Sequence, residues 1–258
     1  MVKLGIHRKR SGVPVLSQEE INQIGEKVVA DFCPSAMREP QALDVDSFAQ
    51  NYLGMVQDYQ FLSHCGAYLG MTVFNNTNKI PVYNPALQRA EYISASANTI
   101  IIDNTLLASK QEHRYRFTMG HEVGHGLVHG PYFQNKRNHP SSHGGSSVAL
   151  IQCRTDLGRN QQKDPEDWNE KDWMEWQANA LSSAILMPKS MVLKLVESIK
   201  TKGHPKETEI IRGLRYTQEV SNTFNVSTQA AQYRLQGLGV LPKGLAFLPG
   251  ALDFLDIF

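Results

Sequence analysis

Hydrophobic and polar positions first follow a helical pattern after Ser17. Ser17 can accept a hydrogen bond at a helix start, and Glu20 stands three residues later, as in a capping box. Apolar residues then recur at helical spacing on one face: Ile21, Ile24 and Val28. The pattern predicts an amphipathic helix from residue 17 and a loop over residues 34–40.

The next segments predict a second helix and two short strands. Residues 46–55 have helical spacing. Residues 70–74 and 99–102 are short runs with β-branched side chains, bounded by turn residues. Asn and Pro at 75–78 and 84–85 supply turns between them. A small β-sheet is therefore expected.

Two longer helices are predicted in the middle of the chain. The first runs from Arg114 to His129 and ends before Pro131, whose ring cannot continue a helix. The second begins near Pro165 or Asp167, runs to Met187 and is stopped by the following proline. The polar stretch between the two helices contains one apolar run, 148–151, which we interpret as an edge strand within a surface loop.

The composition changes after Pro188. Residues 189–244 contain six Lys and three Arg against four Glu and have the pattern of several short helices. We expect an α+β, helix-rich protein with three parts: a domain over 1–188, a helical module over 189–244 and an apolar tail over 245–258. The tail is expected to dock on the protein's own surface, with a partner-binding peptide as the alternative.

Composition excludes several classes of protein. The 258 residues are 41% hydrophobic and 20% charged, with a formal net charge of +1, which gives no overall argument for nucleic acid or a membrane surface. The three cysteines have no close partner and indicate free thiols in a reducing compartment. Neither a secretory signal nor an apolar run long enough to span a membrane is present. A soluble, cytoplasmic protein is expected.

Candidate chemistry lies in the sequence from Thr118 to Leu127. His121 and His125 are four residues apart, so on a helix both imidazoles can reach one metal ion. Glu122 stands one residue round the helix, where it can reach a water at the metal and act as the catalytic base. The alternative is a buried helix with two histidines that are satisfied by hydrogen bonds.

A catalytic zinc site needs a third protein ligand. His129 continues the four-residue spacing, but it lies about 12 Å along the helix axis from His121. It is therefore expected at the surface or behind a ligand. Glu175 is the better candidate, with Asn179 one turn later to hydrogen-bond an imidazole from behind. A solvated surface glutamate is an equal alternative from this helix alone.

A further donor must stabilise the oxyanion that forms if a water at the metal attacks a carbonyl group. The sequence offers five candidates without choosing among them: Tyr83, Tyr92, Arg116, His139 and His143.

The two motifs together resemble the ImmA/IrrE family of bacterial metallopeptidases. The matching segments are 116–118 with 121–125, then 175–179 and 186–188, with 102–103 upstream and 226–239 downstream. The resemblance covers roughly residues 40–240. It implies a gluzincin-like, zincin-type core followed by a helix-turn-helix-like module. It also implies one zinc ion on His121, His125 and Glu175, with Glu122 as base.

The resemblance further implies a zinc-dependent endopeptidase that cuts a regulatory protein, such as a helix-turn-helix repressor, in stress response or transcription regulation. The stretch between His125 and Glu175 is longer than expected for the family, and no long sensor domain follows the helical module. Two His and one carboxylate also suit manganese or iron.

The alternative function is a non-proteolytic zinc-containing regulatory module that binds DNA or protein. Residues 220–235 predict helix, turn and helix, an arrangement that can read DNA. The second helix has few phosphate-binding side chains beyond Arg234, so protein docking or structural support is preferred to DNA binding.

Overall fold

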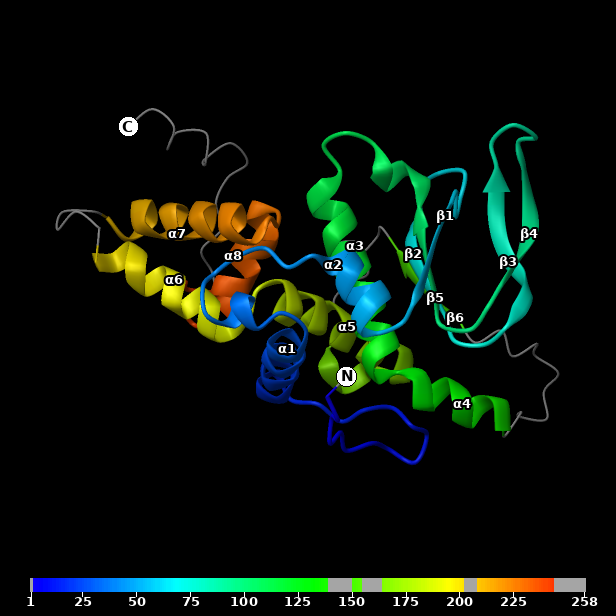
Figure 1. Ribbon diagram of the computed structural model, residues 1–258, viewed down its shortest axis with the longest axis horizontal. Coiled ribbons are helices and arrows are strands. Elements are labelled where there is room, and N and C mark those ends of the chain that lie inside the picture. Colours follow the sequence, from blue (N-terminus) through cyan, green and yellow to red (C-terminus); the bar gives the residue numbers. More distant parts are fainter. Residues whose placement is uncertain (1, 139–149, 155–163, 202–207, 244–258) are drawn as a thin grey trace.

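The computed structural model describes residues 2–138, 150–154, 164–201 and 208–243. Figure 1 shows three regions side by side: a sheet with a separate hairpin, a central group of helices, and a group of C-terminal helices. The tail over 245–258, and residues 139–149 and 155–163 of the long stretch between the two central helices, lie outside the described residues.

The helices and strands follow one another in a mixed order. The longer helices are α1 (Gln18–Phe32), α3 (Glu112–Val128), α4 (Gly130–Asn138), α5 (Glu170–Leu186), α6 (Lys189–Thr201), α7 (Glu209–Phe224) and α8 (Thr228–Gly237). The strands are β1 (Val56–Gln60), β2 (Tyr68–Val73), β3 (Thr77–Asn84), β4 (Arg89–Ala95), β5 (Thr99–Asp103) and β6 (Leu150–Arg154). Short helical turns occupy Pro34–Met37, Asn104–Leu107 and Pro165–Asp167. The expected helix-rich α+β class is confirmed.

The main sheet has the order β1-β5-β2-β6. β1 runs parallel to β5, whereas β2 is antiparallel to β5 and β6, with Met71 opposite Ile101. Every residue of β5 is buried because both faces of the sheet are covered. Ile100 and Ile102 pack in the large core with α3, and Ile101 packs on the other side with the hairpin. The core face of this sheet therefore rests on α3.

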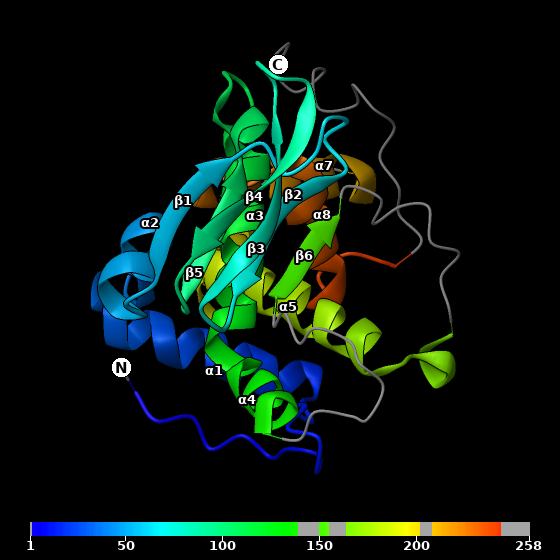
Figure 2. The same ribbon diagram turned by 90° about the vertical axis from the view of Figure 1, so that its right-hand side faces the viewer.

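The hairpin β3–β4 was not predicted. The sequence indicated only turns at 75–78 and 84–85 in this part of the chain. Its apolar residues Ile80 and Val82 pack on Met71 and Val73 of β2. Figure 2 shows the hairpin in front of the sheet, on the face away from α3. The Asn84 side-chain oxygen accepts hydrogen bonds from the backbone N–H groups of Ala86 and Leu87. These bonds shape the turn.

Local sequence signals placed the first helix correctly. The Ser17 side chain accepts from the Glu20 backbone, and the Glu20 carboxylate accepts from the Ser17 backbone N–H at 2.8 Å, which forms the expected capping box. The helix expected over 46–55 is found slightly shorter and of mixed type: α2 spans Val45–Ser47 and continues directly as a π-helical turn, Phe48–Tyr52. Gly54 then adopts φ +66° and leads directly into β1.

Pro131 does follow the end of a helix, since α3 ends at Val128. A new helix, α4, begins at Gly130, so the surface loop expected there is wrong over Gly130–Asn138. Proline is compatible with the first turn of a helix, where its missing N–H would have no partner. The apolar run expected as an edge strand is found as β6, at the edge of the sheet and shifted toward 154.

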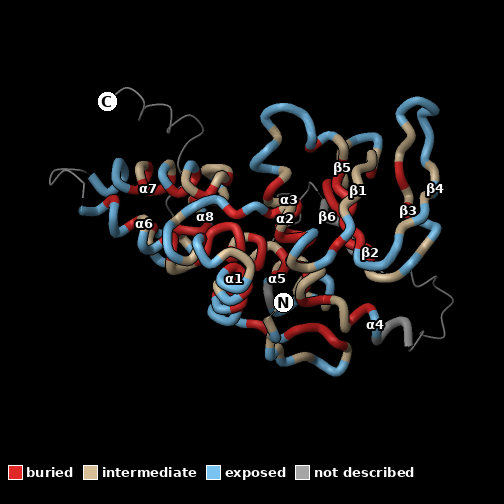
Figure 3. The backbone as a smooth tube through the Cα atoms, viewed as in Figure 1, coloured by how far each residue is buried: buried red, intermediate tan, exposed pale blue. Residues whose placement is uncertain are grey.

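The C-terminal helices share their core with the N-terminal ones. Phe224 of α7 and Leu235 of α8 belong to the same apolar cluster as Val28 of α1 and Leu181 of α5. Figure 3 shows buried positions in the N-terminal and the C-terminal helices alike. Within the described residues, no helix is both long and apolar enough to cross a membrane. The division at residue 188 stays a prediction.

Candidate metal centre

The two histidines lie on α3 where that helix meets α5. Close approach of the helices needs small residues, because a Cβ on Gly124 would lie 3.0 Å from the Ala178 carbonyl oxygen. A Cβ on Gly120 would lie 2.5 Å from the Ser182 hydroxyl oxygen. Gly124 of α3 therefore packs directly on the backbone of Ala178 in α5. As a result, residues 118–125 of α3 are all buried.

His121, His125 and Glu175 converge on one point. Their ligand atoms all lie within 4.8 Å of one another. The two Nε2 atoms are 2.9 Å apart. The Glu175 carboxylate oxygens lie 3.3 Å from His121 Nε2 and 3.7 Å from His125 Nε2. The histidines are fully buried and the glutamate is partly exposed, so the point is accessible from the Glu175 side.

Asn179 and His129 occupy the far sides of the two imidazoles. Asn179 Oδ1 lies 2.9 Å from His121 Nδ1, one helical turn after Glu175. His129 Nδ1 lies 2.9 Å from His125 Nδ1. A surface position for His129 is therefore wrong, because its side chain is fully buried against α5. Each Nδ1 has a partner, which leaves both Nε2 atoms directed at the common point.

Two residues behind His129 were missed by sequence reasoning. Gln177 Oε1 lies 3.0 Å from His129 Nε2, and Gln177 Nε2 donates to the Pro14 carbonyl oxygen at 2.9 Å. Gln177 lies two residues after Glu175 inside the second motif, which was its only local signal. Pro14 gives no signal, since it is 163 residues from Gln177 in the chain.

The charges of the three converging groups are coupled. Burial alone raises the pKa of Glu175, but hydrogen bonds from His121 and His125 lower it well below its ordinary value overall. Burial alone lowers the pKa of His121, but its bond to Glu175 and the nearby carboxylates raise it overall. Burial lowers the pKa of His125 to about 4. In the metal-free cluster at pH 7, the Glu175 carboxylate is thus ionised and the His125 imidazole neutral, and His121 is the imidazole that holds a proton more readily than a free one.

This arrangement fits a bound cation. Two imidazole nitrogens that face each other at 2.9 Å would repel if both presented only lone pairs, so a hydrogen or a metal ion must lie between them. A proton on His121 fills that role without metal. Two nitrogens bound to one zinc ion at about 2.0–2.1 Å lie about 3.3 Å apart at a tetrahedral angle. The observed spacing is within a few tenths of an ångström of that value.

Glu122 lies between α3 and β2. One carboxylate oxygen accepts a hydrogen bond from the Thr72 hydroxyl at 2.6 Å. The other, Oε1, is buried and has no hydrogen-bond partner among the described residues. A Cβ on Gly70 would lie 2.7 Å from Oε1, so glycine is needed there. Burial raises the pKa of Glu122 to about 7, partly offset by His121 and Thr72.

Residues 149–236 match the Peptidase_M78 family, described as the IrrE N-terminal-like domain. The match confirms the resemblance to the ImmA/IrrE family over these residues. That family suggests a metallopeptidase of the IrrE/ImmA type. The matched residues include Glu175, Gln177 and Asn179, whereas His121 and His125 precede them. A comparison with curated proteins found no match.

The five candidates for oxyanion stabilisation have different positions. Arg116 is buried and donates to the carbonyl oxygens of Leu43 and Asn225, both at 2.9 Å, so its guanidinium already has acceptors away from the histidines. Tyr83 and Tyr92 lie on the hairpin, across the sheet from α3. His139 and His143 lie outside the described residues.

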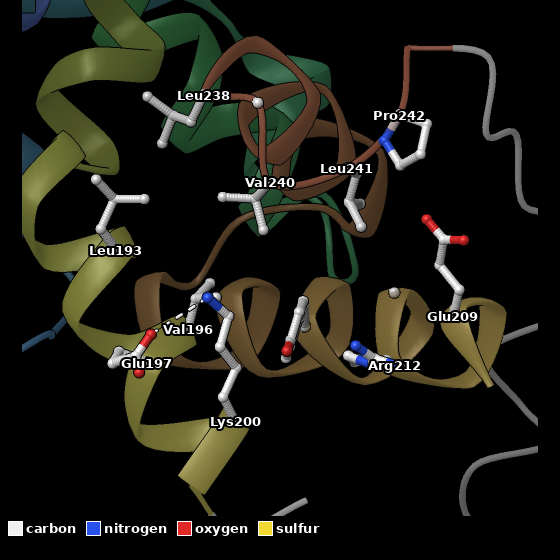
Figure 4. A pocket seen from close by; sticks show the side chains of 13 residues that line it. Leu193, Val196, Glu197, Lys200, Glu209, Arg212, Leu238, Val240, Leu241 and Pro242 are labelled. Carbon is white, nitrogen blue, oxygen red and sulfur yellow. Dashed lines mark hydrogen bonds and ion pairs between the residues drawn. The ribbon is translucent and has the colours of Figure 1, made fainter. Parts of the chain in front are cut away.

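A cavity of about 410 Å³ lies elsewhere in the molecule, among the C-terminal helices. Figure 4 shows Leu193, Val240 and Pro242 around it, with Lys200 and Arg212 at its rim. Its lining contains no histidine or cysteine, and none of the three converging side chains contributes to it. It is therefore separate from the metal centre.

Proposed function

We propose that this protein is a zinc-dependent endopeptidase that holds one catalytic zinc ion on His121, His125 and Glu175. The observation that carries the proposal is the pair of facing Nε2 atoms, 2.9 Å apart beside an ionised carboxylate. Both Nδ1 atoms have partners of their own, whereas the two Nε2 atoms lie against each other and the Glu175 carboxylate. Three protein ligands leave a fourth position for substrate or water.

When bound, zinc polarises a peptide carbonyl and makes a water acidic enough to ionise near neutral pH. Glu122 is the proposed general base. Its unpartnered Oε1 accepts a proton from the attacking water and then returns it to the leaving amine. Thr72 holds the other oxygen in place, and Gly70 leaves the space that Oε1 occupies. A carboxylate that is already held in position loses less conformational entropy when the reaction begins.

We further propose that the substrate is a regulatory protein, such as a helix-turn-helix repressor. The family resemblance is the support for this substrate. The partly exposed position of Glu175 is compatible with a polypeptide that enters from that side.

A DNA-binding role has less support. The α7–turn–α8 arrangement has a left-handed Asn225 between the helices and a Ser227 cap on α8. Arg234, the residue of α8 best suited to phosphate, is buried, and its guanidinium donates to Met187 O and Asn22 Oδ1. It cannot reach a duplex without leaving the core, which favours a structural or protein-docking role for this module.

The first test is metal content by mass spectrometry of the purified wild type, Glu122→Gln and Glu175→Ala. We expect about one zinc per chain in the first two and much less in the third. Glu219→Ala, at an exposed position on α7, is the matched control and keeps its zinc. Equal zinc in Glu175→Ala and the wild type would contradict the ligand set, and dominant manganese or iron would contradict the choice of metal.

The second test uses Glu122→Gln as an inactive trap. We expect it to retain zinc, to fail to cleave and to capture the substrate from a lysate for identification. A Glu122→Gln protein that cleaves the captured substrate as fast as the wild type would contradict the role of Glu122 as base.

A further inference from the structure

A chain of hydrogen bonds leads from the N-terminal segment to the imidazole of His125. Pro14 O accepts from Gln177 Nε2 at 2.9 Å, Gln177 Oε1 lies 3.0 Å from His129 Nε2, and His129 Nδ1 lies 2.9 Å from His125 Nδ1. Gln177 is 1% exposed and His129 is 0% exposed, so water does not compete for these bonds.

The direction of every bond follows from the Pro14 carbonyl. A carbonyl oxygen only accepts, so the Gln177 amide must turn its NH₂ toward Pro14 and its oxygen toward His129. That oxygen also only accepts, so His129 Nε2 must carry a hydrogen. A neutral imidazole has one N–H, which leaves His129 Nδ1 as an acceptor. His125 must therefore donate from Nδ1, and its Nε2 keeps a free lone pair.

We propose that His129 and Gln177 are positioning residues that hold His125 in the tautomer whose Nε2 lone pair binds the metal, with Pro14 as the fixed end of the chain. The inference rests on the proposed metal site. His129 touches neither metal nor substrate; it acts through His125. Hydrogen bonds to the remote nitrogen of a ligating histidine are known to set its orientation and basicity.

The N-terminal segment is itself attached to the end of α3. Arg8 donates to the Val128 carbonyl oxygen at 2.6 Å and to Gly12 O at 3.1 Å. Backbone bonds between Lys9 and Val13 close the turn, and Val13 is buried in a small cluster with Met174 of α5. Pro14 is thus held against both helices that carry the ligands, which keeps its carbonyl oxygen in place.

The first experiment measures zinc affinity by competition with a chelator at neutral pH. We expect His129→Phe, which keeps the ring but removes the acceptor, to weaken zinc binding by about 10- to 100-fold. His129→Asn should recover most of that loss, because its Oδ1 stands where Nδ1 stood and can accept from His125. His113→Phe, at an exposed position on α3, is the matched control and should bind zinc as the wild type does.

The second experiment needs no variant. Long-range ¹H–¹⁵N NMR of the zinc-free wild type distinguishes the two imidazole tautomers. We expect the hydrogen of His129 on Nε2 and that of His125 on Nδ1. A hydrogen on His129 Nδ1 would overturn the inference, and this result is readable even if His129→Phe does not fold.

The outcomes separate this inference from the proposed function. If the wild type binds zinc and His129→Phe binds it equally tightly, the positioning role is wrong and the zinc site stands. If the wild type binds no zinc but shows the expected tautomers, the hydrogen-bond chain is right and the zinc peptidase is wrong. If His129→Asn binds no better than His129→Phe, His129 acts only by filling space and the positioning role is again wrong.

Discussion

The Thr72 hydroxyl donates a hydrogen bond to the Glu122 carboxylate at 2.6 Å and lies 3.1 Å from the Glu122 carbonyl oxygen. Thr72 is on β2 and Glu122 is on α3, so one strand residue contacts both the main chain and the side chain of the proposed base. The strand thereby fixes one oxygen of the carboxylate and leaves the other without a partner among the described residues. Orientation of the base depends on contact between sheet and helix.

Replacing Thr72 by valine tests this contact. Valine keeps the shape and removes the hydroxyl, so we expect kcat to fall about 10- to 100-fold, since a hydrogen bond to a charged group contributes about 1.5–3 kcal/mol. Because the Thr72 bond lowers the pKa of Glu122, its loss raises that pKa. The acidic limb of the pH–rate profile should therefore move to higher pH, while zinc content is unchanged.

Thr217→Val is the matched control for Thr72. Thr217 is also buried, but its hydroxyl donates to Gly213 O within α7. It should leave kcat and the pH profile unchanged. Equal activity of Thr72→Val and Thr217→Val would show that Thr72 does not position the base.

Gly70→Ala should separate catalysis from metal binding. The added Cβ would lie 2.7 Å from Glu122 Oε1 and 2.8 Å from Thr118 Cγ2, so Glu122 must move. We expect cleavage to fall by at least tenfold with about one zinc per chain retained. Gly237→Ala is the control, since nothing lies within 4 Å of a Cβ at that position. Full activity of Gly70→Ala would contradict the assigned location of the working carboxylate.

Zinc binding should release about one proton near neutral pH. The His121 pKa is raised, so that imidazole is protonated without metal below its pKa. The His125 pKa of about 4 and the lowered Glu175 pKa leave those ligands already deprotonated. Metal binding therefore displaces a proton from His121 alone. Below the His121 pKa, zinc affinity should fall about tenfold for each pH unit.

Calorimetry in buffers of different ionisation enthalpy measures this proton count directly. A value near two would mean that a second group also loses a proton: His125, Glu175 or the water that zinc makes acidic. A value near zero at pH values below the ordinary histidine range would mean that no imidazolium lies between the two Nε2 atoms.

Arg234→Met tests whether the C-terminal helices depend on a buried guanidinium. The change leaves the Met187 carbonyl oxygen and Asn22 Oδ1 without their donor, and we expect a loss of about 1–3 kcal/mol in the free energy of unfolding. Denaturant titration measures it. Arg114→Met, at an exposed position on α3, should cost much less. A stable Arg234→Met that has lost salt-dependent binding to duplex DNA would instead support the DNA-binding alternative.

Much of the helical structure could be predicted because its causes are local. Ser17 and Glu20 form their capping box from within four residues, and Pro188 ends α5 wherever that helix lies. The four-residue spacing of His121 and His125 puts them on one helix face by geometry alone. The predictions were incomplete where the local sequence pattern favoured more than one structure or indicated none. The pattern over residues 46–55 predicted a helix but not its type. Phe48, whose ring packs on Phe32 and Tyr52, begins a π-helical turn there.

The surroundings of the site could not be predicted in the same way. Thr72 and Gly70 stand in an ordinary strand sequence, and their importance follows from the packing of β2 on α3. The hairpin β3–β4 packs on Met71 and Ile101, which belong to other strands. A pattern read within the hairpin's own segment cannot reveal these contacts. For His129, the sequence left open a place at the surface or behind a ligand, and the packing of α5 with Gln177 decides for the second.

The sequence by itself determined the residues capable of chemistry: two histidines at helical spacing, a glutamate between them and a second glutamate in a recognisable motif. These are properties of single helices, and helix geometry relates residues three or four apart. Only the tertiary structure decided how those residues are held. The bonds of Thr72 to Glu122, of Asn179 to His121 and of Pro14 through Gln177 and His129 to His125 join distant segments. Such contacts form only when packing excludes water and brings those segments together.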